Sequence, residues 1–285
     1  MLKLVGYFLT IFYMTGVFFP ALLPAMILLI SQMAGHAAFA LFALLIARGM
    51  RRSTNHFLYF IRLVIAAFAS EIIAVIAAWQ LRIAFIERNA LFTYAASLAM
   101  LAGLSMMVGC YRDLVAHVIP ADGKWDQKPL FGVPVNPGNY RMSPVVGIVI
   151  GLLTVGLSVF VTLFFHFSHG VFGLLFVTAA FLAMGGKEDQ PNTRFRHSLF
   201  ASPTWLLRTL LYVVALVLVF ALVDIIVYRS GSAYTFTRLA VLLSVPLAVV
   251  LPEPSKPPKA LRRWLTYAAL PLMLALITIV RWFVS

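Results

Sequence analysis

Apolar stretches, separated by charged residues and turn formers, follow one another along the whole chain. Between Lys3 and Arg48 no residue carries a formal charge. That interval is too long for one membrane-spanning helix of about 20 residues and long enough for two. Pro20 and Pro24 divide it, because proline lacks the backbone donor that a helix interior needs.

The same pattern along the rest of the chain predicts an all-α bundle of about nine transmembrane helices. The eighth apolar run is the shortest and needs the preceding Tyr234–Thr237 to reach the length of a span. The expected spans are Leu4–Phe19, Met26–Ala47, Phe57–Trp79, Asn89–Tyr111, Val145–Phe165, Gly170–Gly186, Trp205–Tyr228, Leu239–Leu251 and Trp264–Val280.

The composition supports a single integral membrane domain over residues 1–285. Of the 285 residues, 62% are hydrophobic and 11% are charged, whereas a soluble domain has about 45–50% and about 25%. So few polar side chains cannot cover a soluble globule. The composition therefore excludes a soluble enzyme and a nucleic-acid-binding domain, and it makes the lipid bilayer the first partner.

The basic residues predict the orientation. With the nine spans alternating in direction, sixteen Lys and Arg residues fall on the side of the N-terminus and five on the other, while Arg62 lies inside the third span. Because basic loops stay in the cytoplasm, we expect a bacterial inner-membrane protein with a cytoplasmic N-terminus and a periplasmic C-terminus. The net charge of +13 then reflects topology.

The longest loop, residues 112–143, falls on the cytoplasmic side and is rich in proline and glycine. Turn formers at this density exclude a helix. The loop is a solvated connector, an ordered lid or a docking segment for a partner.

Polar groups inside the expected spans are the first candidates for a site, because an ionisable group costs at least about 2.5–3.5 kcal/mol at bilayer depth. Glu71 lies near the middle of the third span and His36 midway along the second. The two are expected to pair as a catalytic acid–base unit, a proton relay or a structural hydrogen bond. Asp224, Arg238 and Arg62 lie closer to span ends and are expected to reach the interface.

Metal chemistry is not expected. Cys110 is the single cysteine, so neither a disulfide nor a thiolate cluster is possible within the chain. His166 and His169 share a short outer turn, but the sequence places no third ligand beside them.

Several segments, in order, resemble the TraX family of bacterial inner-membrane proteins, which is associated with N-terminal acetylation of conjugative pilin. The segments that carry the resemblance are Leu2-Lys3-Leu4 with Gly16, Gly35–Ala43 with Gly49, Arg52-Ser53-Thr54, Tyr59–Leu63, Ser70-Glu71-Ile72, Asn89–Thr93, Gly170–Leu175, and Tyr267 with Pro271–Leu274. The resemblance implies a membrane-embedded acyltransferase that uses acetyl-CoA or a similar donor and acts on a pilin-like acceptor. Glu71 and His36 would be catalytic, and Arg62, Arg51 and Arg52 would attract the anionic donor.

This chain departs from the family pattern at four positions. The family's Asp-His pair falls on Tyr13 and Met14, a later histidine falls on Met273, and an arginine falls on His36. Two other functions therefore stay open: a catalytically degenerate subunit of a conjugation, secretion or pilus assembly, and a transporter that uses Glu71 as its coupling carboxylate.

Overall fold

The computed structural model describes residues 2–52, 56–82, 89–115, 143–184, 203–227, 233–250 and 260–284. These residues form helices and no strand, which confirms the expected all-α class. The helices are α1 (Leu2–Phe18), η1 (Pro20–Leu22), α2 (Ala25–Arg52), α3 (His56–Leu81), α4 (Ala90–Val115), α5 (Pro144–Phe164), α6 (Gly170–Ala183), α7 (Pro203–Val227), α8 (Ala233–Arg238), η3 (Leu239–Leu243), α9 (Ser244–Val250) and α10 (Ala260–Val284).

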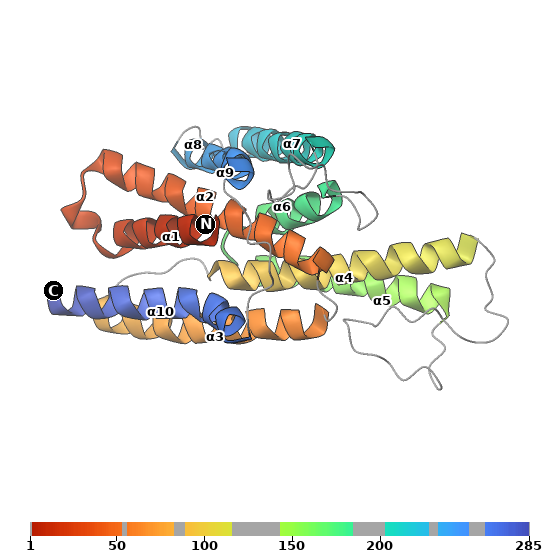
Figure 1. The fold of residues 1–285 in the computed structure, drawn as a ribbon, viewed down its shortest axis with the longest axis horizontal. Coiled ribbons are helices and arrows are strands. Elements are labelled where there is room, and N and C mark those ends of the chain that lie inside the picture. Colours follow the sequence, from red (N-terminus) through yellow and green to blue (C-terminus); the bar gives the residue numbers. More distant parts are fainter. Residues whose placement is uncertain are drawn as a thin grey trace.

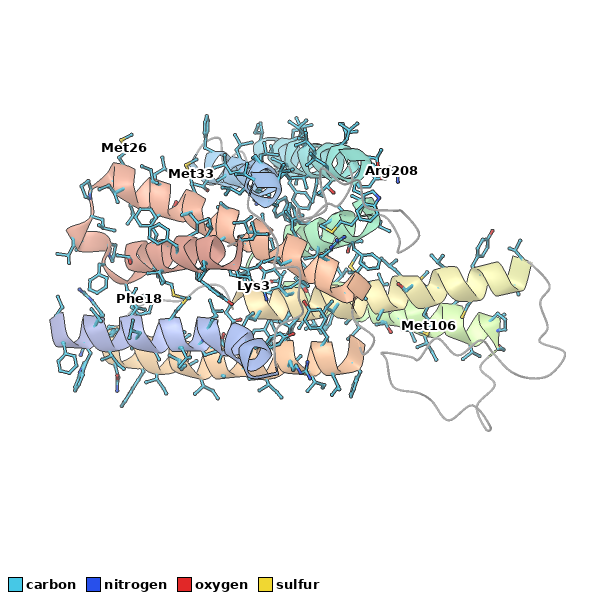
Figure 2. All side chains as sticks on the ribbon, viewed as in Figure 1. Lys3, Phe18, Met26, Met33, Met106 and Arg208 are labelled. Atoms are coloured by element: carbon cyan, nitrogen blue, oxygen red, sulfur yellow. The ribbon has the colours of Figure 1, made fainter. Side chains whose placement is uncertain are left out.

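Six helices in the described part of the chain are long and apolar enough to cross a membrane: α2, α3, α4, α5, α7 and α10. Three shorter apolar helical stretches, Leu2–Phe18, Gly170–Ala183 and Phe236–Val250, fall where the other spans were expected. Large apolar side chains on the outer faces are exposed, as for Met26 at 73%, which points away from the bundle (Figure 2). Such a surface needs lipid around it, so the chain is a membrane-embedded helix bundle.

α1 and α2 form an antiparallel hairpin at one end of the bundle (Figure 1). Gly6 faces Phe42, and Gly35 faces Tyr13 so closely that an added Cβ would lie 2.6 Å from Tyr13 Cδ2. At these positions glycine lets the two helices approach, as is usual for helix pairs in membranes.

α4 and α5 form a second close hairpin, and it is shifted along the bundle relative to α3. The side-chain amide of Asn89, directly before α4, donates to the carbonyl of Ala67 in the middle of α3 at 3.0 Å. From there α4 runs antiparallel to α3 and extends beyond its first residue (Figure 1), by about 20 Å at 1.5 Å per residue.

In the eighth apolar stretch α8, η3 and α9 follow one another without a gap, so that a 3₁₀ segment lies within a continuous helix. Pro246, inside α9, cannot donate to the carbonyl four residues earlier, and its ring crowds that turn. The tighter 3₁₀ turns of Leu239–Leu243 directly precede it. Arg238, the last residue of α8, lies within the bundle, where it is 7% exposed.

Candidate functional site

His36 and His169 meet in the interior of the bundle. His36, on α2, is 8% exposed. The centroid of its ring lies 5.0 Å from that of His169, with the rings nearly perpendicular. Phe39, almost one turn further along α2, stacks on His169 with a centroid distance of 3.8 Å. Two imidazoles held together inside a membrane protein are a candidate functional site.

The turn between α5 and α6 carries His169 into this position. His166 and His169 both adopt left-handed backbone conformations, with φ of 52° and 62°. Such conformations cost non-glycine residues on the order of 1–3 kcal/mol and occur where the surrounding structure enforces them. The hydroxyl of Thr93, on α4, donates to the carbonyl of Ser168 and fixes the turn.

An ion pair adjoins the histidines. Arg238 Nη1 donates to Asp224 Oδ2, on α7, at 2.6 Å, and each residue is 7% exposed. The guanidinium also lies over the rings of Phe172 and Phe220, at 5.1 and 5.7 Å. Its charge acts on both His36 and His169.

We call His36, Thr93, His169, Asp224 and Arg238 the polar centre. It joins α2, α4, α7, α8 and the turn before α6. Tyr94 stands beside it and donates its hydroxyl to the carbonyl of Phe39 at 2.8 Å. The centre combines two imidazoles, a hydroxyl and a neutralised ion pair, which together can accept, hold and return a proton.

Asp224 and Arg238 are buried by neighbouring helices, and their expected reach to the membrane interface stays a prediction. Both lie near helix ends, as the sequence indicated, but those ends are covered by neighbouring helices. A charge buried in this way needs a partner, and each supplies the other's.

Glu71 was expected to have a polar partner because of its depth in the span, and Asn89 is such a partner. Asn89 Nδ2 donates to Glu71 Oε2 at 3.3 Å and to the carbonyl of Ala67. Its Oδ1 accepts from the backbone N–H of Leu91 and so caps α4. His36 packs against the ring of His169. The pairing of Glu71 with His36 stays a prediction.

The expected donor-binding arginines are only partly described. Arg62 is half-buried on α3, two turns and a half from Glu71. The side chains of Arg51 and Arg52, at the end of α2, lie outside the described residues, as does most of the loop 112–143. Their role in holding an anionic donor stays a prediction.

The positions at which the resemblance implies histidines come together in an apolar cluster. Met14, on α1, is buried with Phe18, Ala77 and Leu274, and Met273, on α10, packs against the same cluster. Tyr13 packs against Gly35, next to His36.

The sequence alone did not identify His169, Asp224 and Arg238 as members of one site. A signal existed: the membrane segments hold few ionisable residues, and His169 stands beside a glycine at the start of an apolar run. The sequence indicates the depth of each residue along its own helix but not which helices are neighbours.

The described residues contain no group of three or more His, Cys, Asp or Glu side chains that could hold a metal ion. Within the polar centre the carboxylate of Asp224 is paired with Arg238. The two imidazoles are the side chains of the centre best suited to exchange protons with a substrate.

No family model matches the chain, and no curated protein or solved structure matches it either.

Proposed function

We propose that the chain is a TraX-like acyltransferase of the bacterial inner membrane, with its chemistry in the polar centre. The observation that carries the proposal is the pair of imidazoles of His36 and His169, held 5.0 Å apart beside a buried ion pair. In this proposal all nine apolar stretches cross the membrane, with the N-terminus in the cytoplasm and the C-terminus in the periplasm.

Acyl transfer needs a base for the acceptor's proton, and histidine is the side chain most often used. His36 takes that proton as the acceptor nitrogen or oxygen attacks the acyl carbonyl. The bond from the acyl carbon to the donor breaks, the new amide or ester bond forms, and the imidazolium returns the proton to the leaving group. The ring of His169 packs against that of His36, and Phe39 stacks on His169.

The donor in this proposal is acetyl-CoA or a similar acyl carrier, and the acceptor is a pilin-like or other envelope protein. Arg62, Arg51 and Arg52 lie toward the basic side of the membrane and would attract an anionic donor. These assignments rest on the resemblance.

Three matched substitutions test the site: His36→Asn, His169→Asn and the control His166→Asn. Asparagine tolerates the left-handed conformation of the turn, so both turn variants keep the backbone. We expect His36→Asn to lower transfer of labelled acyl groups by about 10²–10⁴, the usual loss when an acid–base group is removed. His169→Asn removes the ring that packs against His36 and should lower transfer by less. His166, which is exposed, should be replaceable without loss. Full turnover in His36→Asn would refute the assignment.

Glu71→Gln distinguishes a structural hydrogen bond at Glu71 from an acid–base role. Glutamine keeps an oxygen that can accept from Asn89, so we expect folding to be retained and turnover to stay within about tenfold of wild type. A loss of about 10²–10⁴ would instead make Glu71 an acid–base group. The measurement is the turnover rate of purified protein, with thermal unfolding in detergent as the control for folding.

A degenerate membrane subunit is the second candidate, and one observation favours it. Met14 and Met273, at two positions where the resemblance implies histidines, pack together in an apolar cluster. If this function holds, the wild type shows no transfer. The His→Asn variants would then change only stability or assembly with partners.

A further inference from the structure

The last turns of α3 and α10 carry tryptophans and arginines. Trp79 and Trp282 each lie two residues before the last residue of their helix, and they are 82% and 61% exposed. Arg82 directly follows α3, and Arg281 lies in the last turn of α10. The two helices pack against each other and end on the same side of the bundle (Figure 1). Because tryptophan is enriched where membrane meets water, this end of the bundle has the composition of that boundary.

Arg281 rests on an aromatic ring at the edge of the bundle. Its guanidinium carbon lies 5.3 Å from the centroid of the ring of Phe19, which directly follows α1. On α10, Pro271, Leu274 and Thr278 are buried at a spacing of three to four residues, and Arg281 continues this line. The arginine is therefore half-buried where the ends of α1 and α10 meet.

Carboxylates that the structure describes are paired elsewhere. Asp224 pairs with Arg238, and Glu71 accepts from Asn89. Glu71 also lies ten residues before the end of α3, about 15 Å along the helix axis. Within the described part of the chain Arg281 takes part in no ion pair. Its charge at the end of the bundle therefore suits an anion from outside the described residues.

The way in which Arg281 is held suits a phosphate. A ring beneath the guanidinium occupies its face and leaves the N–H groups along its edge for acceptors. Two oxygens of one phosphate can accept from two such N–H groups, and the opposite charges strengthen both hydrogen bonds.

We infer that Arg281, held on Phe19, binds the phosphate of a membrane phospholipid. Apolar side chains are exposed on both helices on the membrane side of the arginine, among them Ile11 on α1 and Leu276 on α10. A phospholipid carries a phosphate joined to apolar chains, and it matches the arginine and these side chains together. Free phosphate matches the arginine alone. The inference does not depend on the proposed acyl transfer.

Trp282, the neighbour of Arg281 in the chain, can report on the bound lipid. The chain has five tryptophans. Trp79, Trp125 and Trp264 are replaced by phenylalanine, whereas Trp205 is buried, at 4% exposed, and stays as a constant background. The protein in detergent is titrated with lipids that have brominated chains, because bromine quenches tryptophan fluorescence on contact. Phosphatidylglycerol is compared with diacylglycerol, which has the same chains and no phosphate.

We expect phosphatidylglycerol to quench Trp282 at a concentration about fivefold lower than diacylglycerol, the usual effect of one basic residue on an anionic lipid. Arg281→Gln should remove this preference. Phe19→Leu, which removes the ring beneath the guanidinium, should weaken it. The control Arg208→Gln should keep it, because Arg208 is exposed and lies far from Phe18, at the other end of the bundle (Figure 2).

Equal quenching by the two lipids in the wild type would overturn the phosphate site. A full preference that survives Arg281→Gln in folded protein, with folding checked by thermal unfolding, would overturn the assignment to Arg281. Loss of the preference in millimolar inorganic phosphate would show that free phosphate occupies the site, and would overturn the lipid as its ligand.

Discussion

Gly173, on α6, packs closely against the polar centre. An added Cβ there would lie 2.6 Å from Thr93 Cγ2, 3.0 Å from Phe39 Cζ and 3.2 Å from His169 Cβ. Because all three are tightly packed, Gly173→Ala should destabilise the protein by about 1–3 kcal/mol, as overpacking does, and should displace His169.

Gly109→Ala is the matched control, since nothing lies within 4 Å of an added Cβ at Gly109 on α4. Alanine is the better helix former there. Thermal unfolding in detergent should show a lower midpoint for Gly173→Ala and an unchanged or higher one for Gly109→Ala. Equal midpoints would contradict the close approach of α6.

Removing one partner of the ion pair of Asp224 and Arg238 should lower the stability of the protein more than removing both. Asp224→Leu leaves a guanidinium buried without its carboxylate, and such a loss costs about 3–5 kcal/mol. Replacing both residues, as in Asp224→Leu with Arg238→Met, removes both desolvated charges and should recover much of that loss. A double-mutant cycle by chemical denaturation measures the coupling; additive effects would show that the two charges do not depend on each other.

The sequence predicted individual residues of the polar centre better than it predicted which residues come together there. A histidine midway along an uncharged span marks His36, because a polar group at that depth is costly. The burial of Asp224 and Arg238 was not predicted, because both lie near helix ends, where side chains can reach the membrane interface. Their burial depends on how α7, α8 and α9 pack around the 3₁₀ segment before Pro246. The hydrophobic pattern of either residue's own helix does not predict that packing.

At the scale of the helices, the α4–α5 pair depends on two glycines whose backbones nearly touch. An added Cβ at Gly151 would lie 2.7 Å from the carbonyl oxygen of Gly103 and would also meet Met107. A backbone carbonyl cannot move aside as a side chain can. Gly151→Ala should therefore separate α4 from α5 and lower stability, by about 1–3 kcal/mol.

Gly156→Ala, on the same helix, is the control for this prediction, because nothing lies within 4 Å of its added Cβ. Both variants can be compared by thermal unfolding and by crosslinking between cysteines placed on α4 and α5. Equal crosslinking and equal stability would show that the pair tolerates a wider spacing.

The apolar helices themselves were predictable from the sequence, since charges and prolines bound them. Their ends differ from expectation by a few residues; α4, for example, continues to Val115. The pattern did not predict the 3₁₀ segment within the eighth stretch, nor the shift of α4 along α3 by about half a helix. Both depend on contacts between helices, such as the bond from Asn89 to Ala67.

At the scale of the whole molecule, the predicted topology of nine crossings can be tested directly with reporter fusions. A reporter that is active only in the periplasm, fused after Ser285, should be active, because an odd number of spans carries the chain across. The same reporter within Asp122–Gly138 should be silent, and a cytoplasmic reporter should work there. A C-terminal fusion active only in the cytoplasm would require an even number of spans.

The shift of α4 against α3 makes the apolar surface longer than a bilayer is thick. From Leu81 to Val115 the two helices cover about 60 Å along a common axis at 1.5 Å per residue, against a hydrocarbon core of about 30 Å. The lipid-facing belt must therefore run obliquely around the bundle, or the bilayer must deform. Mismatch costs a fraction of a kcal/mol for each ångström, so lipid chain length should act on the angle between α3 and the α4–α5 hairpin. Asn89 and Thr93 lie where the two helices meet, and membrane thickness thereby becomes a variable that acts on His36 and His169.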